Sequence, residues 1–111
     1  MAYDEELAER VRAVLAGGEG VSERKMFGGL AFMINGNMAC GIVRDELMLR
    51  LGAEGADEAL EHPHVRPMDF TGRPMTGMVY VESGGLGDSE LRGWVEQAAG
   101  FARSLPPKKS K

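Results

Sequence analysis

The sequence predicts an α+β fold, in which helices near the two ends of the chain pack on an antiparallel β-meander as a two-layer α/β sandwich. Apolar residues recur at helical spacing near both ends of the chain. Between these ends, short apolar runs alternate with turn sequences, which is typical of strands. With 111 residues, 43% of them hydrophobic, the chain is long enough for one modest core. We expect a single domain over residues 1–105 and a disordered basic tail over residues 106–111.

The first expected element is an amphipathic helix that begins after Asp4 and ends before Gly17-Gly18. Leu7, Val11 and Leu15 recur at i, i+4 and i+8, which places them on one side of a helix. Asp4 is of the residue type that caps a helix N-terminus, and glycine ends helices. The helix is therefore expected to bury its leucine and valine side on the sheet.

A three-strand meander is expected between residues 24 and 51. Asn35-Gly36 suits the two positive φ angles of a type I′ turn, so the segments on either side are predicted to pair directly. A second turn at Arg44-Asp45-Glu46 leads into the third strand. In this interpretation both faces of the sheet are apolar, whereas a sheet with one wet face alternates apolar with polar residues. Each face is therefore expected to be covered.

The register of the third strand stays open, because a slip of one residue exchanges the two faces of a strand. A three-residue loop, which we favour, would place Leu47, Leu49 and Leu51 on the face of Leu30, Phe32 and Ile34. A two-residue loop would place them on the opposite face, which in this interpretation carries Met33, Met38, Cys40 and Ile42.

The rest of the chain is expected to complete the sheet and add the longest helix. A short helix, an extended segment confined to a sheet edge by its prolines, a turn and a strand are predicted over residues 53–61, 65–70, 71–74 and 78–81. The last helix, over residues 88–105, carries apolar side chains on one side and ends at Pro106-Pro107. Leu91 and Trp94 are expected to seat it on the sheet.

Composition excludes several classes of protein. Seventeen acidic and 13 basic residues give a formal charge of −4, so a chain-wide attraction to nucleic acid is not expected. The acidic start of the chain does not resemble a signal peptide and there is a single cysteine, so we expect a cytoplasmic protein. No apolar run approaches the roughly 20 residues that a membrane helix requires, so no membrane contact is expected.

The residue types that could carry chemistry are few. Cys40, His64 and Asp69 are the types of a nucleophile, a base and an orienting acid, yet nothing in the sequence places them together. Cys40 lies in a predicted strand, where a free cysteine behaves as a small hydrophobe. The His62-Pro63-His64 segment offers only two histidines as metal ligands, so it indicates a solvated turn rather than a metal site. We therefore expect no enzymatic activity, no cofactor and no metal.

Three motifs occur in order along the chain. They are Arg24-Lys25-Met26-Phe27-Gly28-Gly29, Leu47-Met48-Leu49-Arg50-Leu51-Gly52 and Arg66-Pro67-Met68-Asp69-Phe70-Thr71-Gly72-Arg73-Pro74-Met75. On these motifs the chain resembles the N-terminal domain of the TfoX/Sxy family of competence regulators, over about residues 4–105.

This resemblance implies an α+β sandwich and a stand-alone protein similar to the TfoX N-terminal domain. Full-length family members are transcriptional co-activators of DNA-uptake genes, act alongside a cyclic-AMP receptor protein and carry a second, helical domain. The present chain is expected to end where that second domain would begin. The family provides no catalytic residues to carry over.

The leading hypothesis is a non-enzymatic regulatory module that binds another protein or a second copy of itself. The protein partner would belong to the transcription machinery or be a receptor protein, and a homodimer is expected. The contact would use a sheet face or two loops, with the candidate interaction residues Arg24, Lys25, Met26, Phe27, Gly28, Gly29, Arg50, Arg66, Met68, Asp69, Phe70, Gly72 and Arg73.

Two alternatives from other classes stay open. One is direct nucleic-acid binding, if folding gathers the basic side chains of Arg24, Lys25, Arg50, Arg66 and Arg73. The other is a small-molecule-binding protein or thiol-dependent enzyme built around Cys40. A charged Arg50 among apolar neighbours also needs solvent or a carboxylate, for which Asp69 is the candidate.

Overall fold

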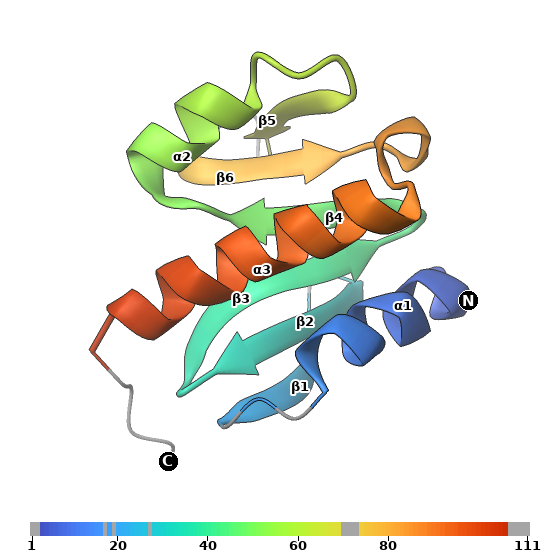
Figure 1. Cartoon of the computed structure of the whole chain (residues 1–111), viewed down its shortest axis with the longest axis vertical. Coiled ribbons are helices and arrows are strands. Elements are labelled where there is room, and N and C mark those ends of the chain that lie inside the picture. Colours follow the sequence, from blue (N-terminus) through green and yellow to red (C-terminus); the bar gives the residue numbers. More distant parts are fainter. Residues whose placement is uncertain (1–2, 17, 19, 27, 70–73, 107–111) are drawn as a thin grey trace.

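The computed structural model describes residues 3–16, 18, 20–26, 28–69 and 74–106, without the side chains at positions 26, 68–69 and 74–76. In this part of the chain six antiparallel strands form one sheet in the order β1-β2-β3-β4-β6-β5, with α-helices packed on it (Figure 1). The predicted α+β sandwich is confirmed. The elements are α1 (Glu5–Leu15), β1 (Val21–Met26), β2 (Gly29–Ile34), β3 (Asn37–Val43), β4 (Glu46–Arg50), α2 (Gly52–Ala59), β5 (Val65–Asp69), β6 (Pro74–Val81), the short 3-10 turn η1 (Ser83–Gly85) and α3 (Asp88–Ser104).

The helices begin and end close to the predicted positions. The side chain of Asp4 accepts hydrogen bonds from the backbone N–H groups of Glu6 and Leu7 at 2.9 and 3.1 Å, which confirms it as the cap of α1. Helix α3 ends at Ser104, just before Pro106, which cannot continue a helix. No helix in the described ranges is long and apolar enough to span a bilayer.

Strand β1 is an addition to the predicted meander. It pairs with β2 from Val21↔Ile34 to Met26↔Gly29 and forms one edge of the sheet. Its sequence is mostly polar, and Ser22, Glu23 and Lys25 are exposed. An edge strand needs little apolar character, because solvent covers its outer side. Apolar and polar residues therefore do not alternate clearly enough in residues 21–26 for the sequence to predict this strand.

The register of the meander differs from the prediction at two points. The loop between β3 and β4 has two residues, because Val43 pairs with Glu46, so the favoured three-residue loop is wrong. A β-bulge lies opposite Phe32 and Met33, where the partners skip from Cys40 to Met38. An extra residue on one strand reverses the faces beyond it. The strand leucines therefore share a face with Phe32, as expected, but Cys40 and Ile42, predicted on the opposite face, join them there.

The last two strands form a hairpin at the other edge of the sheet. Strand β6 pairs with β4, and β5 pairs with the outer side of β6. Pro67 therefore lies on an edge strand, as predicted, where its missing N–H interrupts no ladder between inner strands. The predicted turn over residues 71–74 lies outside the described residues except for Pro74, which is the first residue of β6.

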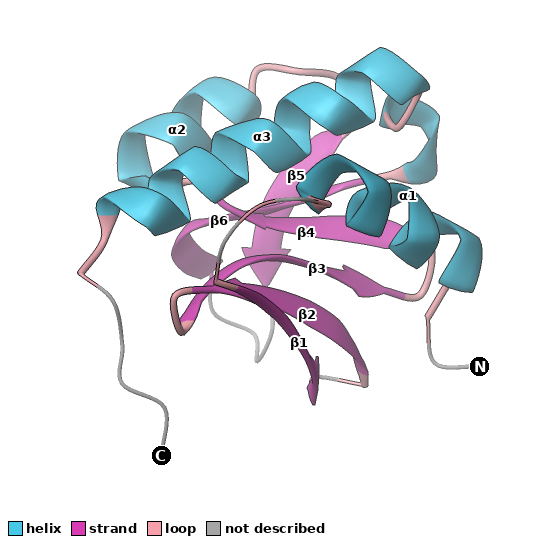
Figure 2. Ribbon diagram, turned by 60° about the horizontal axis from the view of Figure 1, so that its bottom comes forward, coloured by secondary structure: helices cyan, strands magenta, loops and turns pink. Residues whose placement is uncertain are grey.

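The two faces of the sheet are covered differently. Helices α1, α2 and α3 all lie on one face (Figure 2), over a large core that includes Phe32, Leu49 and Val95. The opposite face carries no helix of the described part of the chain. Its smaller apolar cluster consists of Met48, Met78 and Tyr80, with Met38 and Val43 packed beside them.

The C-terminal segment is tied to the meander at one point. Asn37 is buried, and its side-chain amide donates a hydrogen bond of 2.9 Å to the backbone oxygen of Pro106. This bond satisfies a polar group that would be costly to bury alone. The rest of the predicted tail, residues 107–111, lies outside the described residues.

Candidate functional site

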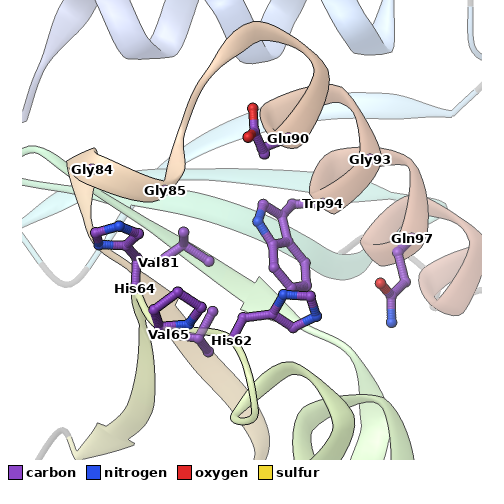
Figure 3. A pocket seen from close by; sticks show the side chains of 11 residues that line it. His62, His64, Val65, Val81, Gly84, Gly85, Glu90, Gly93, Trp94 and Gln97 are labelled. Carbon is purple, nitrogen blue, oxygen red and sulfur yellow. The ribbon is translucent and has the colours of Figure 1, made fainter.

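A cleft of about 520 Å³ lies where the start of β5, the η1 turn and α3 meet (Figure 3). Its volume is within the range of small-ligand sites. Four lining residues come from two turns of α3: Glu90, Gly93, Trp94 and Gln97. Because residues three and four apart share one side of a helix, these positions form one continuous wall.

Trp94 forms the centre of this wall. Its ring packs in part against the main core and in part lines the cleft. The imidazole of His62, from the turn after α2, meets the indole edge to face, with ring centroids 5.2 Å apart and an angle of 81° between the ring planes. Aromatic pairs favour this geometry. Contacts with the core and with His62 therefore hold the indole in place, while part of it faces the cleft.

The opposite wall is made by the η1 turn and His64. A Cβ atom placed at Gly84 would lie 2.8 Å from His64 Cε1, and one at Gly85 would lie 2.7 Å from His64 Cβ. Both distances are too short for a side chain, so the turn requires glycine to approach the imidazole. The backbone N–H of Glu82 also donates to the His64 oxygen at 2.8 Å, which fixes the turn to the start of β5.

The charged side chain among the described residues that line the cleft is the carboxylate of Glu90. None of these described residues is lysine or arginine. In the described part of the chain Glu90 makes no ion pair. At neutral pH the cleft is therefore suited to a cation rather than to an anion.

The structure does not join the residues of the thiol hypothesis. Cys40 is fully buried, and burial raises the pKa of its thiol to about 12. Cys40 lies on β3 and His64 precedes β5, three strand positions away, which is roughly 14 Å across the sheet. The side chain of Asp69 lies outside the description. Among the described residues, no group of three or more His, Cys, Asp and Glu side chains is placed to hold a metal ion.

The first predicted interaction segment is a strand and a tight turn rather than a loop. Arg24 and Lys25 are exposed on β1, whose last residue is Met26. Gly28 has a φ of 72°, which favours glycine in the turn to β2. A Cβ at Gly29 would clash with the carbonyl oxygen of Ile42 on β3. The two glycines are therefore explained by backbone geometry. Phe27 and the side chain of Met26 lie outside the description.

The second predicted segment is divided between β5 and β6. Arg66 lies over the ring of Tyr80, with its guanidinium carbon 4.5 Å from the ring centroid. It also hydrogen-bonds Glu46 and approaches Glu82 at 3.6 Å. The hydrogen bond to Glu46 raises the pKa of Arg66 above its ordinary value. Arg66 therefore covers Tyr80 on the helix-free face. The loop residues Phe70, Gly72 and Arg73, and the side chains of Met68 and Asp69, lie outside the description.

The described basic candidates do not gather into one patch. Arg24 and Lys25 lie on the edge strand β1, and Arg66 lies on the opposite edge strand β5. Five strand spacings separate these edges, roughly 24 Å. Arg50 lies elsewhere, with its guanidinium carbon 5.8 Å from the centre of the Phe101 ring. Asp69 was the carboxylate partner expected for Arg50, and its side chain lies outside the description.

The cleft beside Trp94 was not predicted from the sequence. The turn containing His62 and His64 and the glycines of η1 were recognised only as turns. Gly93 carried the clearest signal, because glycine weakens a helix interior and this one directly precedes the tryptophan. Sequence spacing alone could not show that these three segments converge.

The geometry defines a small α+β domain with an open antiparallel sheet, helices on one face and a cleft beside Trp94 on α3. The family profile described as the TfoX N-terminal domain matches residues 13–102. The chain belongs to this family. Searches of curated proteins and of solved structures found no match.

Proposed function

We propose that the chain is a non-enzymatic regulatory module that works by protein interaction, in the cytoplasm and in the setting of transcriptional control suggested by TfoX co-activators. The observation that carries this proposal is the one-sided cover of the sheet: α1, α2 and α3 pack on one face (Figure 2), while the described side chains of the other face form a smaller apolar cluster of methionine, tyrosine and valine. An apolar face with no helix over it is suited to contact with a second protein surface.

The composition of the helix-free face supports contact with a protein. Met38 and Val43 are half-buried there and pack against the cluster of Met48, Met78 and Tyr80. Methionine side chains are flexible and polarizable, and they fit partner surfaces of different shape. The partner that we propose first is a second copy of the chain, because a two-fold arrangement would cover the helix-free face on both copies.

Light scattering coupled to size exclusion tests the self-association. A dimer is expected for the native chain and a monomer for Met38→Lys, because burying a lysine charge on the helix-free face would be costly. Leu60→Lys is the matched control: Leu60 is an exposed large hydrophobic residue, and it follows α2 on the other side of the molecule. It should leave the dimer intact.

Circular dichroism would verify that both variants fold. A native chain that stays monomeric at about 1 mM, the concentration at which a weak complex of roughly 4 kcal/mol is half formed, would rule out the dimer. A dimer that resists Met38→Lys but is lost in Leu60→Lys would place the interface on the helix side instead.

A further inference from the structure

We propose that the cleft beside Trp94 binds a guanidinium group. The inference concerns a different part of the molecule from the helix-free face and does not depend on self-association. It rests on the acceptors that line the cleft, on the aromatic wall and on an unfilled position in α3.

The first support is the arrangement of hydrogen-bond acceptors. Glu90 lies one helical turn before Trp94, and Gln97 lies nearly one turn after it, so both line the cleft from the side of α3 that carries the indole. The Glu90 carboxylate turns back toward Gly87 at the start of the helix (Figure 3). It can turn toward a cation in the cleft by rotation about its own side-chain bonds. A guanidinium group is planar, permanently charged and carries five N–H donors. It can stack on the indole and donate to Glu90 or to Gln97, which lie roughly 10 Å apart along the helix axis. A phosphate or carboxylate ligand would find no lysine or arginine among the described lining residues.

The second support is the aromatic wall itself. Tryptophan is the strongest aromatic partner for a cation, and arginine stacks on its face more often than lysine does. The edge-to-face contact with His62 and the contact with the core hold the indole in place before any ligand arrives. A preformed wall reduces the ordering that binding would otherwise require.

The third support is Gly93. A Cβ placed at this position would meet no atom within 4 Å, so an alanine would fit without a clash. Glycine weakens the middle of a helix relative to alanine. Neither packing nor a positive φ explains a glycine here, and its effect is to leave the cleft open directly beside Trp94.

The chain provides its own reporter, because it contains a single tryptophan. Titration with N-acetyl-arginine amide is expected to change the fluorescence of Trp94 saturably, with a Kd on the order of 1 mM or tighter. N-acetyl-citrulline amide has nearly the same shape but carries a neutral ureido group. It should bind at least about tenfold more weakly, a difference of about 1.4 kcal/mol.

Three variants locate the site. Glu90→Gln keeps the size of the side chain and removes its charge, and it should weaken binding of the arginine amide by about five- to tenfold. Gly93→Leu should abolish binding by filling the cleft. Gly100→Leu is its control, because Gly100 also has no atom within 4 Å of a Cβ but lines a different hollow of α3. It should bind like the native chain.

Agmatine, a free amine with the same guanidinium group, distinguishes the source of the ligand. Tighter binding of agmatine would point to a small metabolite, tighter binding of the arginine amide to an arginine side chain of a partner, and equal binding to recognition of the guanidinium alone. The proposal is overturned if neither compound gives a saturable change by about 10 mM, if the citrulline amide binds equally well, or if Gly93→Leu binds as the native chain does.

Discussion

The helix-covered face and the helix-free face of the sheet are both apolar, but they are built from different side chains. Under the helices, branched and aromatic residues such as Phe32 and Leu49 belong to one large cluster. On the other face, Met48 folds over β3, where a Cβ at Gly41 would lie 2.8 Å from the Met48 Cε atom. Arg66 covers Tyr80 there. Among the described residues, one face is thus closed by whole helices and the other by single side chains, so we expect the second face to open more easily.

The largest expected difference concerns chemical access to the helix-covered face. Burial raises the pKa of the Cys40 thiol from 9.0 to about 12, so its reactive thiolate should be about a thousandfold scarcer at pH 8 than in an unfolded chain. Iodoacetamide should label Cys40 in concentrated urea and leave it unlabelled in buffer, as read by mass spectrometry. Rapid labelling of the folded chain would contradict the packing described for β3.

Adjacent residues on β4 compare the stability of the two faces. Leu49 and Met48 are 0% and 1% exposed, respectively, but they point to opposite faces. Leu49→Ala should lower the free energy of unfolding by about 4 kcal/mol, and Met48→Ala by about 2 kcal/mol, because the smaller, flexible cluster can collapse around the gap. Urea denaturation measures both. Equal losses would show that the two faces are equally well packed.

Arg66 tests whether a single side chain covers the helix-free face. Arg66→Ala should lower the free energy of unfolding by about 1 kcal/mol, through loss of the contact with Tyr80 and of the ion pair with Glu46. Arg66→Lys should recover only part of this loss, because an ammonium group cannot stack as a guanidinium does. If the lysine variant is as stable as the native chain, the contribution of Arg66 is its charge alone.

The smallest expected effect lies where α1 meets the edge strand β1. Arg12 Nε lies 2.6 Å from Glu23 Oε2, and this hydrogen bond holds the pKa of the Glu23 carboxyl below its ordinary value of 4.5. The pair is partly exposed, so Glu23→Gln should cost only about 0.5 kcal/mol at pH 7. A lowered folded-state pKa means that the stabilisation is present above pH 4.5 and is lost as the pH falls below that value.

Thermal unfolding of the native chain and the Glu23→Gln variant between pH 7 and pH 3 would measure this dependence. The difference between them should also shrink in 1 M salt, where the screening length falls to about 3 Å. A difference that grows on acidification would contradict the assigned direction.

The sequence was sufficient to predict the helices and the class of fold, because their signals are local. Asp4 caps α1 through its own neighbouring N–H groups, and the apolar side of α3 is visible in its spacing. The register of the meander was less accessible. The bulge beside Ala39 depends on how β2 and β3 pair, which the sequence does not show. The sequence therefore could not predict that Cys40 and the strand leucines lie on the same face.

The cleft was the least predictable feature, because it depends on tertiary convergence. Trp94 was expected to seat α3 on the sheet, and it does pack against the core in part. Its exposed side becomes a wall only because the turn at His62 and the glycines of η1 arrive from other parts of the chain. The residue types in these segments indicated no binding site, and the positions of the segments along the sequence do not give the distances between them in the fold.

The two edge strands limit how the sheet can grow. On β1 the charged residues Glu23, Arg24 and Lys25 are exposed, and on β5 Pro67 lacks the N–H that an added strand would need. An open sheet with such borders resists extension into fibrils at high concentration. Concentrated solutions of the protein should therefore form no fibrils through these edges.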